Sequence, residues 1–189
     1  MLFFAITHSI LARLSVKGWF RTKMGEREYE GFYRILYNVV SVLTLLPAGL
    51  VLISDAGSIM WSVEGPIAIG FRLLQLIGLV GLSLSILQID GGRFIGTSQV
   101  VAYLTGEPLP LPPEPLQTGG VYRIVRHPLY LFSLMLLWFT PTMTSTSLVF
   151  VICATAYFMI GSWFEERTMI KLFGAPYQKY QRKQVKWMA

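Results

Sequence analysis

The stretch PIAIGFRLLQLIGLVGLSLSILQI, residues Pro66–Ile89, holds a single charged side chain, Arg72, among 24 residues. An α-helix rises about 1.5 Å per residue, so roughly 20 apolar residues cross the ~30 Å hydrocarbon core of a bilayer. The stretch is therefore long enough and apolar enough to span a membrane, and it decides the class of fold.

The whole chain is also rich in hydrophobic residues and poor in charged ones. Of its 189 residues, 53% are hydrophobic and 14% are charged, whereas about a quarter of the residues in a soluble domain are charged. The first apolar block, Met1–Leu14, lacks the basic n-region and the cleavage site of a signal peptide, so we interpret it as a short membrane helix. We predict an all-α integral membrane protein, a single domain of residues 1–189, with about five transmembrane helices near 1–14, 32–54, 66–89, 121–140 and 147–164 and a cytoplasmic tail at 165–189 that includes an amphipathic helix.

The basic residues gather on one side of these predicted spans. Six Lys or Arg residues accompany three acids between Arg13 and Arg34, and six accompany two acids from Glu165 onward. By the positive-inside rule, both segments are cytoplasmic. We therefore expect a bacterial inner-membrane protein with its N-terminus outside and with Asp90–Arg126 and the C-terminus in the cytoplasm. The net charge of +6 then reflects topology and contact with lipid, and nucleic acid is not an expected partner.

Nearly all the non-helical polypeptide is predicted on the cytoplasmic side. Residues Ile89–Gly106 are too polar to span a membrane and too apolar to stay in water, which favours an interfacial or re-entrant segment. Asp90 and Gln99 in it are candidate site residues. The following stretch, Thr105–Gly120, contains five prolines, which favour an extended chain. Loops carry function more often than the elements they connect, so a site is expected here.

Basic and ionisable residues lie at the mouth of the fourth predicted helix. The stretch GGVYRIVRHPLYLFSLMLLWF, Gly119–Phe139, places Arg126 and His127 directly before Pro128. Proline disfavours the α conformation of the preceding residue, so Pro128 predicts a helix start; a kinked helix continuing from Gly120 is the alternative. A helix N-terminus favours an anion such as a carboxylate or phosphate, although basic residues also flank most membrane helices as anchors.

The length of this helix raises a second question. From Pro128 to Thr140 it would be about 20 Å long, which is less than the ~30 Å hydrocarbon core. Either the helix runs on past Pro141, or its cytoplasmic mouth is recessed below the lipid headgroups.

The stretch WFEERTMIKLFGAPYQKYQRK, Trp163–Lys183, contains two adjacent acids, Glu165 and Glu166, where the last predicted span ends. Gly174 is predicted to end the helix, and Tyr177 and Tyr180 follow in a second helical piece. An amphipathic tail on anionic lipid would explain the basic residues here but not the two acids. We hypothesise that the Glu-Glu and Arg-His pairs face each other across one pocket and hold a zwitterionic ligand.

The ordered set of motifs resembles a known family. GVYRIVRHPLYL, followed one helical hairpin later by FEERTMIKLFGAPYQKY, is similar to the membrane methyltransferase superfamily that includes isoprenylcysteine carboxyl methyltransferase and phospholipid methyltransferases. THSILARLSVKGWF, FIGTSQVVAYLTG and TPTMT resemble its branch of bacterial methanethiol S-methyltransferases and related denitrification-associated membrane proteins. The chain departs from that branch at Gly91-Gly92-Arg93, where a bulkier apolar residue is expected, and its start looks one helix short.

The resemblance implies S-adenosylmethionine as the cofactor, bound at the cytoplasmic ends of the last two membrane helices, and it implies no metal. The residues that it assigns to the cofactor pocket are Tyr122, His127, Pro128, Leu129, Tyr130, Glu165, Glu166 and Tyr177. This agrees with the charges, because carboxylates suit the α-ammonium group of the cofactor, while Arg126 and the helix start suit its α-carboxylate.

The expected reaction is methyl transfer to a thiol or to a lipophilic thiol or carboxyl acceptor, with a small thiol such as methanethiol favoured. A thiol reacts as its thiolate, and the pKa of a free thiol is about 8.5, so a nearby cation or base would help. The candidates for this catalytic role are Arg126, Arg167 and His8. His8 lies in an apolar helix, where ionisable groups are commonly functional, and a hydrogen bond between helices is its alternative role.

Two other functions remain open at this point. A membrane reductase of the sterol-reductase type shares a similar hairpin and basic-aromatic tail, but it calls for further basic residues to bind the 2′-phosphate of NADPH and for a longer chain. A non-catalytic membrane accessory protein would tolerate replacement of Glu165 and His127. Under the leading hypothesis, the partners are the lipid bilayer and a small or lipid-like methyl acceptor.

Overall fold

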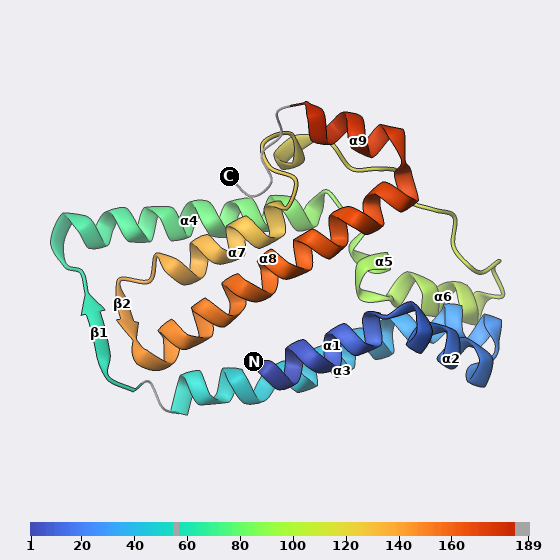
Figure 1. Ribbon diagram of the computed structural model, residues 1–189, viewed down its shortest axis with the longest axis horizontal. Helices are drawn as coiled ribbons and strands as arrows, with labels where there is room; N and C mark the ends of the chain where they lie inside the picture. Colours follow the sequence, from blue (N-terminus) through green and yellow to red (C-terminus); the bar gives the residue numbers. More distant parts are fainter. Residues whose placement is uncertain (55–56, 184–189) are drawn as a thin grey trace. The chain divides into compact units, whose positions relative to one another are not determined.

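A computed structural model describes residues 1–54 and 57–183, and within this range the chain is mostly helical (Figure 1). Asp55, which follows the second predicted span, and residues 184–189 of the predicted tail lie outside the described residues. The helices are α1 (Leu2–Ala12), α2 (Leu14–Met24), α3 (Glu26–Ser54), α4 (Gly65–Leu87), α5 (Gly91–Ile95), α6 (Thr97–Thr105), α7 (Pro128–Trp138), α8 (Ser145–Phe173) and α9 (Ala175–Arg182). Two short strands, β1 (Ile59–Ser62) and β2 (Thr142–Thr144), and one 3₁₀ turn, η1 (Gly120–Arg123), complete the description.

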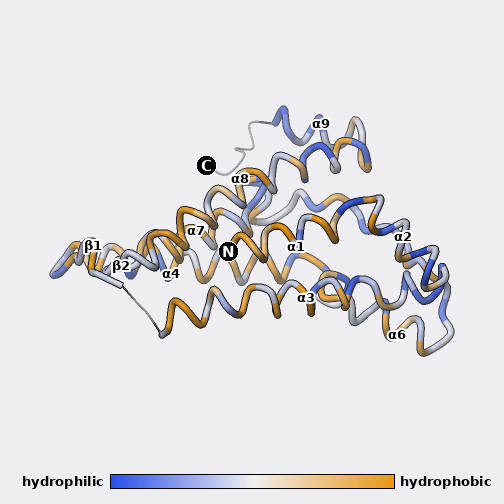
Figure 2. Tube along the Cα trace, turned by 60° about the horizontal axis from the view of Figure 1, so that its bottom comes forward, coloured by the Kyte–Doolittle hydropathy of each residue, from blue (hydrophilic) through white to orange (hydrophobic). Residues whose placement is uncertain are grey.

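Three helices, α3, α4 and α8, are long and apolar enough to cross a membrane. Helices α1 and α7 have 11 residues each, about 16 Å of helix, which is about half of a hydrocarbon core. Figure 2 shows the hydrophobic colour along the candidate spans and the hydrophilic colour on α2 and α9. The mostly helical fold is confirmed, while the count of five spans and the re-entrant segment, where the short helices α5 and α6 lie, stay predictions.

The chain divides into two compact units, one of Met1–Val51 with Asp90–Glu114, and one of Leu52–Ile89 with the chain from Pro115 onward. In the first unit, hydrogen bonds join α3 to its neighbours. The Tyr33 hydroxyl donates to the Leu11 carbonyl of α1 (2.6 Å), and the Asn38 amide donates to the carbonyls of α5. The prediction of a single domain stays a prediction.

In the second unit, α4 and α7 lie side by side (Figure 1), and a glycine makes their close approach possible. A Cβ atom built on Gly81 would lie 2.4 Å from ring carbons of Phe132, which is far inside van der Waals contact. Gly78 faces Met135 one turn away. The small residues that look like breaks in the apolar stretch Pro66–Ile89 are therefore the surface on which α7 packs.

The predicted helix start at Pro128 is confirmed, and the alternative of a kinked helix from Gly120 is wrong, because the proline keeps His127 out of the α conformation (φ −122°, ψ 63°). The helix ends at Trp138 without running past Pro141, so it is shorter than the predicted span 121–140. Beyond the predicted span 147–164 the chain continues as the same helix to Phe173, because nothing between Glu165 and Leu172 interrupts a helix. It stops, as predicted, at Gly174, which adopts a positive φ of 60°.

An antiparallel ribbon of β1 and β2 was not predicted from the sequence. It pairs Ile59 with Thr144 and Ser62 with Thr142, and it joins the connection before α4 to the turn between α7 and α8. The ribbon places these two connections at the same end of the helices in the second unit.

Candidate functional site

The motif residues of the second unit converge where α7 begins, α8 nears its end and α9 follows it (Figure 1). The segment after η1 carries Arg126 and His127, the first turn of α7 carries Tyr130, and α8 carries Glu165 and Glu166. Pro128 starts α7 and is fully buried, so it fixes the chain direction that delivers His127 and Tyr130 to the acids.

Glu166 is the centre of a charged hydrogen-bond network. Its Oε1 lies 2.7 Å from Nε of Arg126 and 3.3 Å from Nε2 of His127, and its Oε2 accepts a hydrogen bond of 3.0 Å from Nε2 of Gln181 in α9. The side chains of Arg126 and Glu166 are 14% and 19% exposed. Charge-assisted hydrogen bonds of this kind are stronger than those between neutral groups, so Glu166 is held in place by three donors.

Glu165 has fewer partners and more exposure. Its Oε2 accepts a hydrogen bond from the Tyr130 hydroxyl (2.9 Å) and lies 3.3 Å from Nδ1 of His127. Its side chain is 38% exposed, and within residues 1–54 and 57–183 no hydrogen bond reaches its Oε1. Glu165 therefore has an accessible acceptor atom, whereas both oxygens of Glu166 are engaged.

His127 links the two carboxylates. Its side chain is 4% exposed, and each ring nitrogen faces a different acid at 3.3 Å. Because a neutral imidazole donates from one nitrogen only, both contacts are hydrogen bonds only when the ring is protonated. Tyr130 stacks on the His127 ring (centroids 5.5 Å apart, planes at 6°) and also on Phe158 of α8, which fixes the orientation of the imidazole.

The hypothesis from the sequence placed the Glu-Glu and Arg-His pairs on opposite walls of a pocket. The structure instead brings them into direct contact, because the long Arg126 side chain reaches Glu166 and the His127 ring fits between the two acids. The charges of the two pairs therefore compensate one another directly, and a ligand held by them stays a prediction.

Tyrosines connect α9 to the site. The Tyr180 hydroxyl donates a hydrogen bond to the backbone carbonyl of Tyr122, and Tyr177 and Tyr180 form a buried cluster with Leu116 and the end of α8. Burial raises the pKa of Tyr180 to about 12, and burial together with the charge of Glu165 raises the pKa of Tyr122 to about 12. Burial, with a contribution from Glu166, also raises the pKa of Tyr177. These phenols are therefore neutral donors at physiological pH.

Two candidate catalytic residues have other partners. The Arg167 guanidinium lies over the ring of Trp163, 3.4 Å from its centroid, on the exposed side of α8. His8, in the first unit, contacts α3: its Nδ1 lies 2.7 Å from Oγ of Ser41, and its Nε2 contacts the Tyr37 hydroxyl. Ser41 gives its only hydroxyl proton to the Tyr37 carbonyl (2.7 Å), so Nδ1 of His8 donates and Nε2 accepts.

Gln181 is the member of the network that sequence reasoning missed. A signal was available, because Gln181 follows Tyr177 by four residues and therefore shares its helix face. Leu129 is half-buried in the first turn of α7. Among the described residues, no group of three or more His, Cys, Asp or Glu side chains could hold a metal ion.

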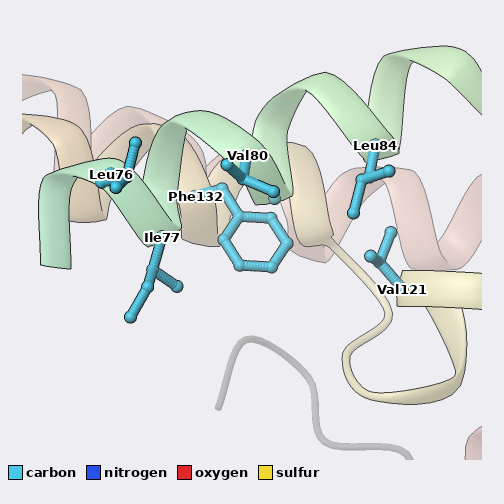
Figure 3. Close-up of a pocket in the computed structure, with 7 residues that line it drawn as sticks. Leu76, Ile77, Val80, Leu84, Val121 and Phe132 are labelled. Carbon is cyan, nitrogen blue, oxygen red and sulfur yellow. The ribbon is translucent and has the colours of Figure 1, made fainter. Parts of the chain in front are cut away.

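An apolar groove of about 370 Å³ runs between α4 and α7 and ends at η1 (Figure 3). The residues that line it are Leu76, Ile77, Val80, Gly81, Leu84, Val121 and Phe132. Without a polar side chain, this groove suits hydrocarbon and offers nothing to a charged ligand. The network around Glu165 and Glu166 is therefore the candidate site for a charged cofactor.

Comparison with known proteins gives consistent relatives. The chain is 32% identical over 184 residues to methanethiol S-methyltransferase 1 of Bradyrhizobium diazoefficiens, covering 97% of this chain and 62% of that protein. It is 31% identical over 186 residues to methanethiol S-methyltransferase of Pseudomonas deceptionensis (95% and 66% covered). It is 30% identical over 185 residues to the enzyme of the same name from Mycobacterium tuberculosis (95% and 71% covered).

The chain thus spans slightly less than two thirds of the length of the first two of these relatives. No solved structure matches it significantly. Residues 76–176, more than half of the chain, match the family described as phospholipid methyltransferase, and they include Arg126, His127, Tyr130 and both acids of the network. The chain therefore belongs to the phospholipid methyltransferase family.

Proposed function

We propose that the protein is a membrane methyltransferase that uses S-adenosylmethionine to methylate a thiol, with a small thiol such as methanethiol the favoured acceptor. The observation that carries the proposal is the accessible carboxylate of Glu165, held beside His127 and Tyr130 at the start of α7. The relatives named methanethiol S-methyltransferase support both the reaction and the acceptor.

The donor set fits S-adenosylmethionine. The exposed Glu165 side chain can accept from the α-ammonium group, while the α7 N-terminus provides a positive dipole for the α-carboxylate. The proposed pocket is completed by Tyr122, Pro128, Leu129 and Tyr177. Glu166 of α8 holds Arg126 and His127 in place. When bound, the cofactor supplies an electrophilic methyl group on a sulfonium.

The chain's own contribution is to bind and orient. Holding two reactants in line can supply several kcal/mol of a barrier, with effective molarities of roughly 10⁵ M or more. The contacts that His127 makes with Glu165 and Glu166 leave little freedom at this end of α7. Arg126, Arg167 and His8 stay our predicted candidates for stabilising the acceptor as a thiolate.

We further propose that the site lies on the cytoplasmic side of a bacterial inner membrane. The 16 Lys and Arg residues of the chain support this orientation, because 15 of them fall on the side predicted to be cytoplasmic. Arg72 is the exception. The short α7 supports a recessed mouth, since it does not run on past Pro141. A donor would then arrive from the cytoplasm and an apolar thiol from the bilayer.

Titration calorimetry of the purified protein in detergent tests the donor site. S-adenosylmethionine and its demethylated product should both bind, whereas NADPH should show no saturable binding. Absence of binding by both sulfur compounds would contradict the proposal, and saturable NADPH binding would favour a reductase.

The variant Glu165→Gln tests the assignment of the site. Loss of a hydrogen bond to a charged group costs about 1.5–3 kcal/mol, so the affinity for the demethylated cofactor should fall by roughly tenfold to a hundredfold. The thermal midpoint should stay near that of the wild type. Glu107→Gln, the same change at an exposed residue, is the matched control. Normal affinity in Glu165→Gln, with a large loss of stability, would assign Glu165 a structural role instead.

The acceptor is tested by transfer of a labelled methyl group. The panel contains methanethiol, longer alkyl thiols, isoprenylated cysteine and phosphatidylethanolamine. We expect the highest kcat/KM for methanethiol. Transfer to phosphatidylethanolamine alone would overturn the thiol assignment but keep the methyltransferase.

A further inference from the structure

Gln181 makes the one side-chain hydrogen bond from α9 to either acid that the structure describes within residues 1–54 and 57–183. Its Nε2 donates to Oε2 of Glu166 at 3.0 Å. Arg126 and His127 use the other oxygen, Oε1, at 2.7 and 3.3 Å. The two oxygens of Glu166 are therefore held from opposite sides, and the amide of Gln181 fixes the rotation of the carboxylate that orients Oε1.

The effect of this rotation can reach Glu165 through His127. The His127 ring lies between Oε1 of Glu166 and Oε2 of Glu165, 3.3 Å from each. If the Glu166 carboxylate turned, the His127 ring would lose the acceptor at Nε2 and could rotate. Glu165, whose Oε2 contacts the Tyr130 hydroxyl and Nδ1 of His127, would then lose the second of these two contacts. Among the described residues no hydrogen bond joins Gln181 to Glu165 or to the start of α7, so its influence on the proposed donor pocket passes through Glu166.

The backbone of α9 is anchored well enough to make Gln181 a fixed support. Tyr177 and Tyr180 are 3% and 7% exposed and pack against the end of α8. The Tyr180 hydroxyl also holds the Tyr122 carbonyl. These contacts hold α9 in place against both α8 and the segment before α7.

We infer that Gln181 is a positioning residue of the donor site, which acts by holding the carboxylate of Glu166 so that His127 and Glu165 present one geometry to S-adenosylmethionine. The inference rests on the proposed function. It adds a second residue of α9 to the site, beside Tyr177, and this residue lies beyond the family match, which ends at residue 176.

The variant Gln181→Glu gives the sharpest test, because it exchanges an amide donor for a carboxyl group of the same shape. At pH 8 two carboxylates would oppose each other, and the affinity for the demethylated cofactor should fall about tenfold relative to wild type. At pH 5.5 the pair can share a proton, since a like charge raises a carboxyl pKa, and the affinity should return to within about threefold of wild type at the same pH.

Other groups facing Glu166 also respond to pH or carry charge, so each comparison uses the wild type at the same pH. These groups are Arg126 and His127 from the loop before α7, Glu165 from α8, and Tyr177 and Tyr180 from α9. Gln178→Glu is the matched control: it makes the same change of charge at an exposed position of the same helix, and its affinity should equal that of the wild type at both values of pH.

Two further variants separate positioning from damage to the fold. Gln181→Lys keeps a donor and should bind within about threefold of wild type, whereas Gln181→Leu keeps the bulk without a donor and should bind about tenfold more weakly. Equal affinities for Gln181→Leu and wild type, or a Gln181→Glu defect that does not change with pH, would overturn the inference alone. Absence of binding by the wild type would overturn the proposed function and this inference together.

Discussion

The network around Glu166 and the cluster around His8 satisfy polar side chains in opposite ways. The network joins charged groups from two segments of the second unit to the neutral amide of Gln181 from a third. It ends at Glu165, whose Oε1 receives no hydrogen bond in the described part of the chain. The His8 cluster joins neutral groups of α1 and α3, and there every donor that the geometry defines has an acceptor: Tyr37 to His8, His8 to Ser41, and Ser41 to the Tyr37 backbone.

This difference separates a site that can accept a ligand from a contact that joins two helices. Unpaired polar groups are costly in a low-dielectric environment. The polar groups of the His8 cluster satisfy one another, so the cluster needs no ligand to be stable. The accessible oxygen of Glu165 becomes useful only when something charged binds to it. We therefore expect changes in the network to alter donor binding, and changes in the cluster to alter stability without altering donor binding.

The largest effect is expected from Glu166→Gln, which removes the charge that pairs with Arg126. Breaking a mostly buried ion pair costs about 3 kcal/mol, and this should lower the thermal midpoint in detergent by roughly 6–12 °C for a chain of this length. Affinity for the demethylated cofactor should fall as well. The matched control is Glu107→Gln, and an unchanged midpoint would show that Arg126 and Glu166 do not depend on each other.

A smaller effect is expected from His8→Phe, which removes both hydrogen bonds of the imidazole but keeps an aromatic ring. Hydrogen bonds between membrane helices contribute about 0.6 kcal/mol on average, so the midpoint should fall by about 2–4 °C. Affinity for the donor should stay at the wild-type value. The rate of methyl transfer at saturating donor decides the catalytic prediction: a normal rate leaves His8 a purely structural role, and a loss of tenfold or more supports its action on the acceptor.

The smallest effect is expected from Arg167→Ala, which leaves both clusters intact. An exposed cation–π contact contributes about 0.5–1 kcal/mol, so the midpoint should fall by no more than about 4 °C. Donor affinity should not change. A loss of transfer rate in Arg167→Ala, restored in Arg167→Lys, would instead support the predicted role of Arg167 in stabilising a thiolate.

Local chemistry made several features predictable from the sequence. Pro128 determined where α7 begins, Gly174 determined where α8 ends, and the apolar stretch Pro66–Ile89 became the candidate span α4. The adjacent acids at 165 and 166 were recognised because acids are unusual beside a basic membrane-flanking segment. Each of these signals lies within a few residues of the feature that it determines.

Features that depend on contacts between distant segments were missed. The ribbon of β1 and β2 depends on the meeting of two turns 80 residues apart, and short strands of mixed polarity leave no periodic signal. Gln181 shares a helix face with Tyr177, but nothing in the sequence indicates that its partner is Glu166. The direct contact of Arg126 with Glu166 depends on how far a flexible side chain extends, which spacing along the sequence does not determine.

The length of α8 has a consequence for enzyme kinetics. Its 29 residues extend about 43 Å, and Glu165 lies about 30 Å from its start, which is the thickness of a hydrocarbon core. If α8 enters the bilayer at its first residue, a site at that height would border water on one side and lipid on the other, and a volatile apolar thiol would concentrate in the lipid. The Michaelis constant for such an acceptor, expressed per volume of solution, would change with the amount of detergent or lipid in the assay. Expressed as the mole fraction of the acceptor in the apolar phase, the Michaelis constant would stay the same.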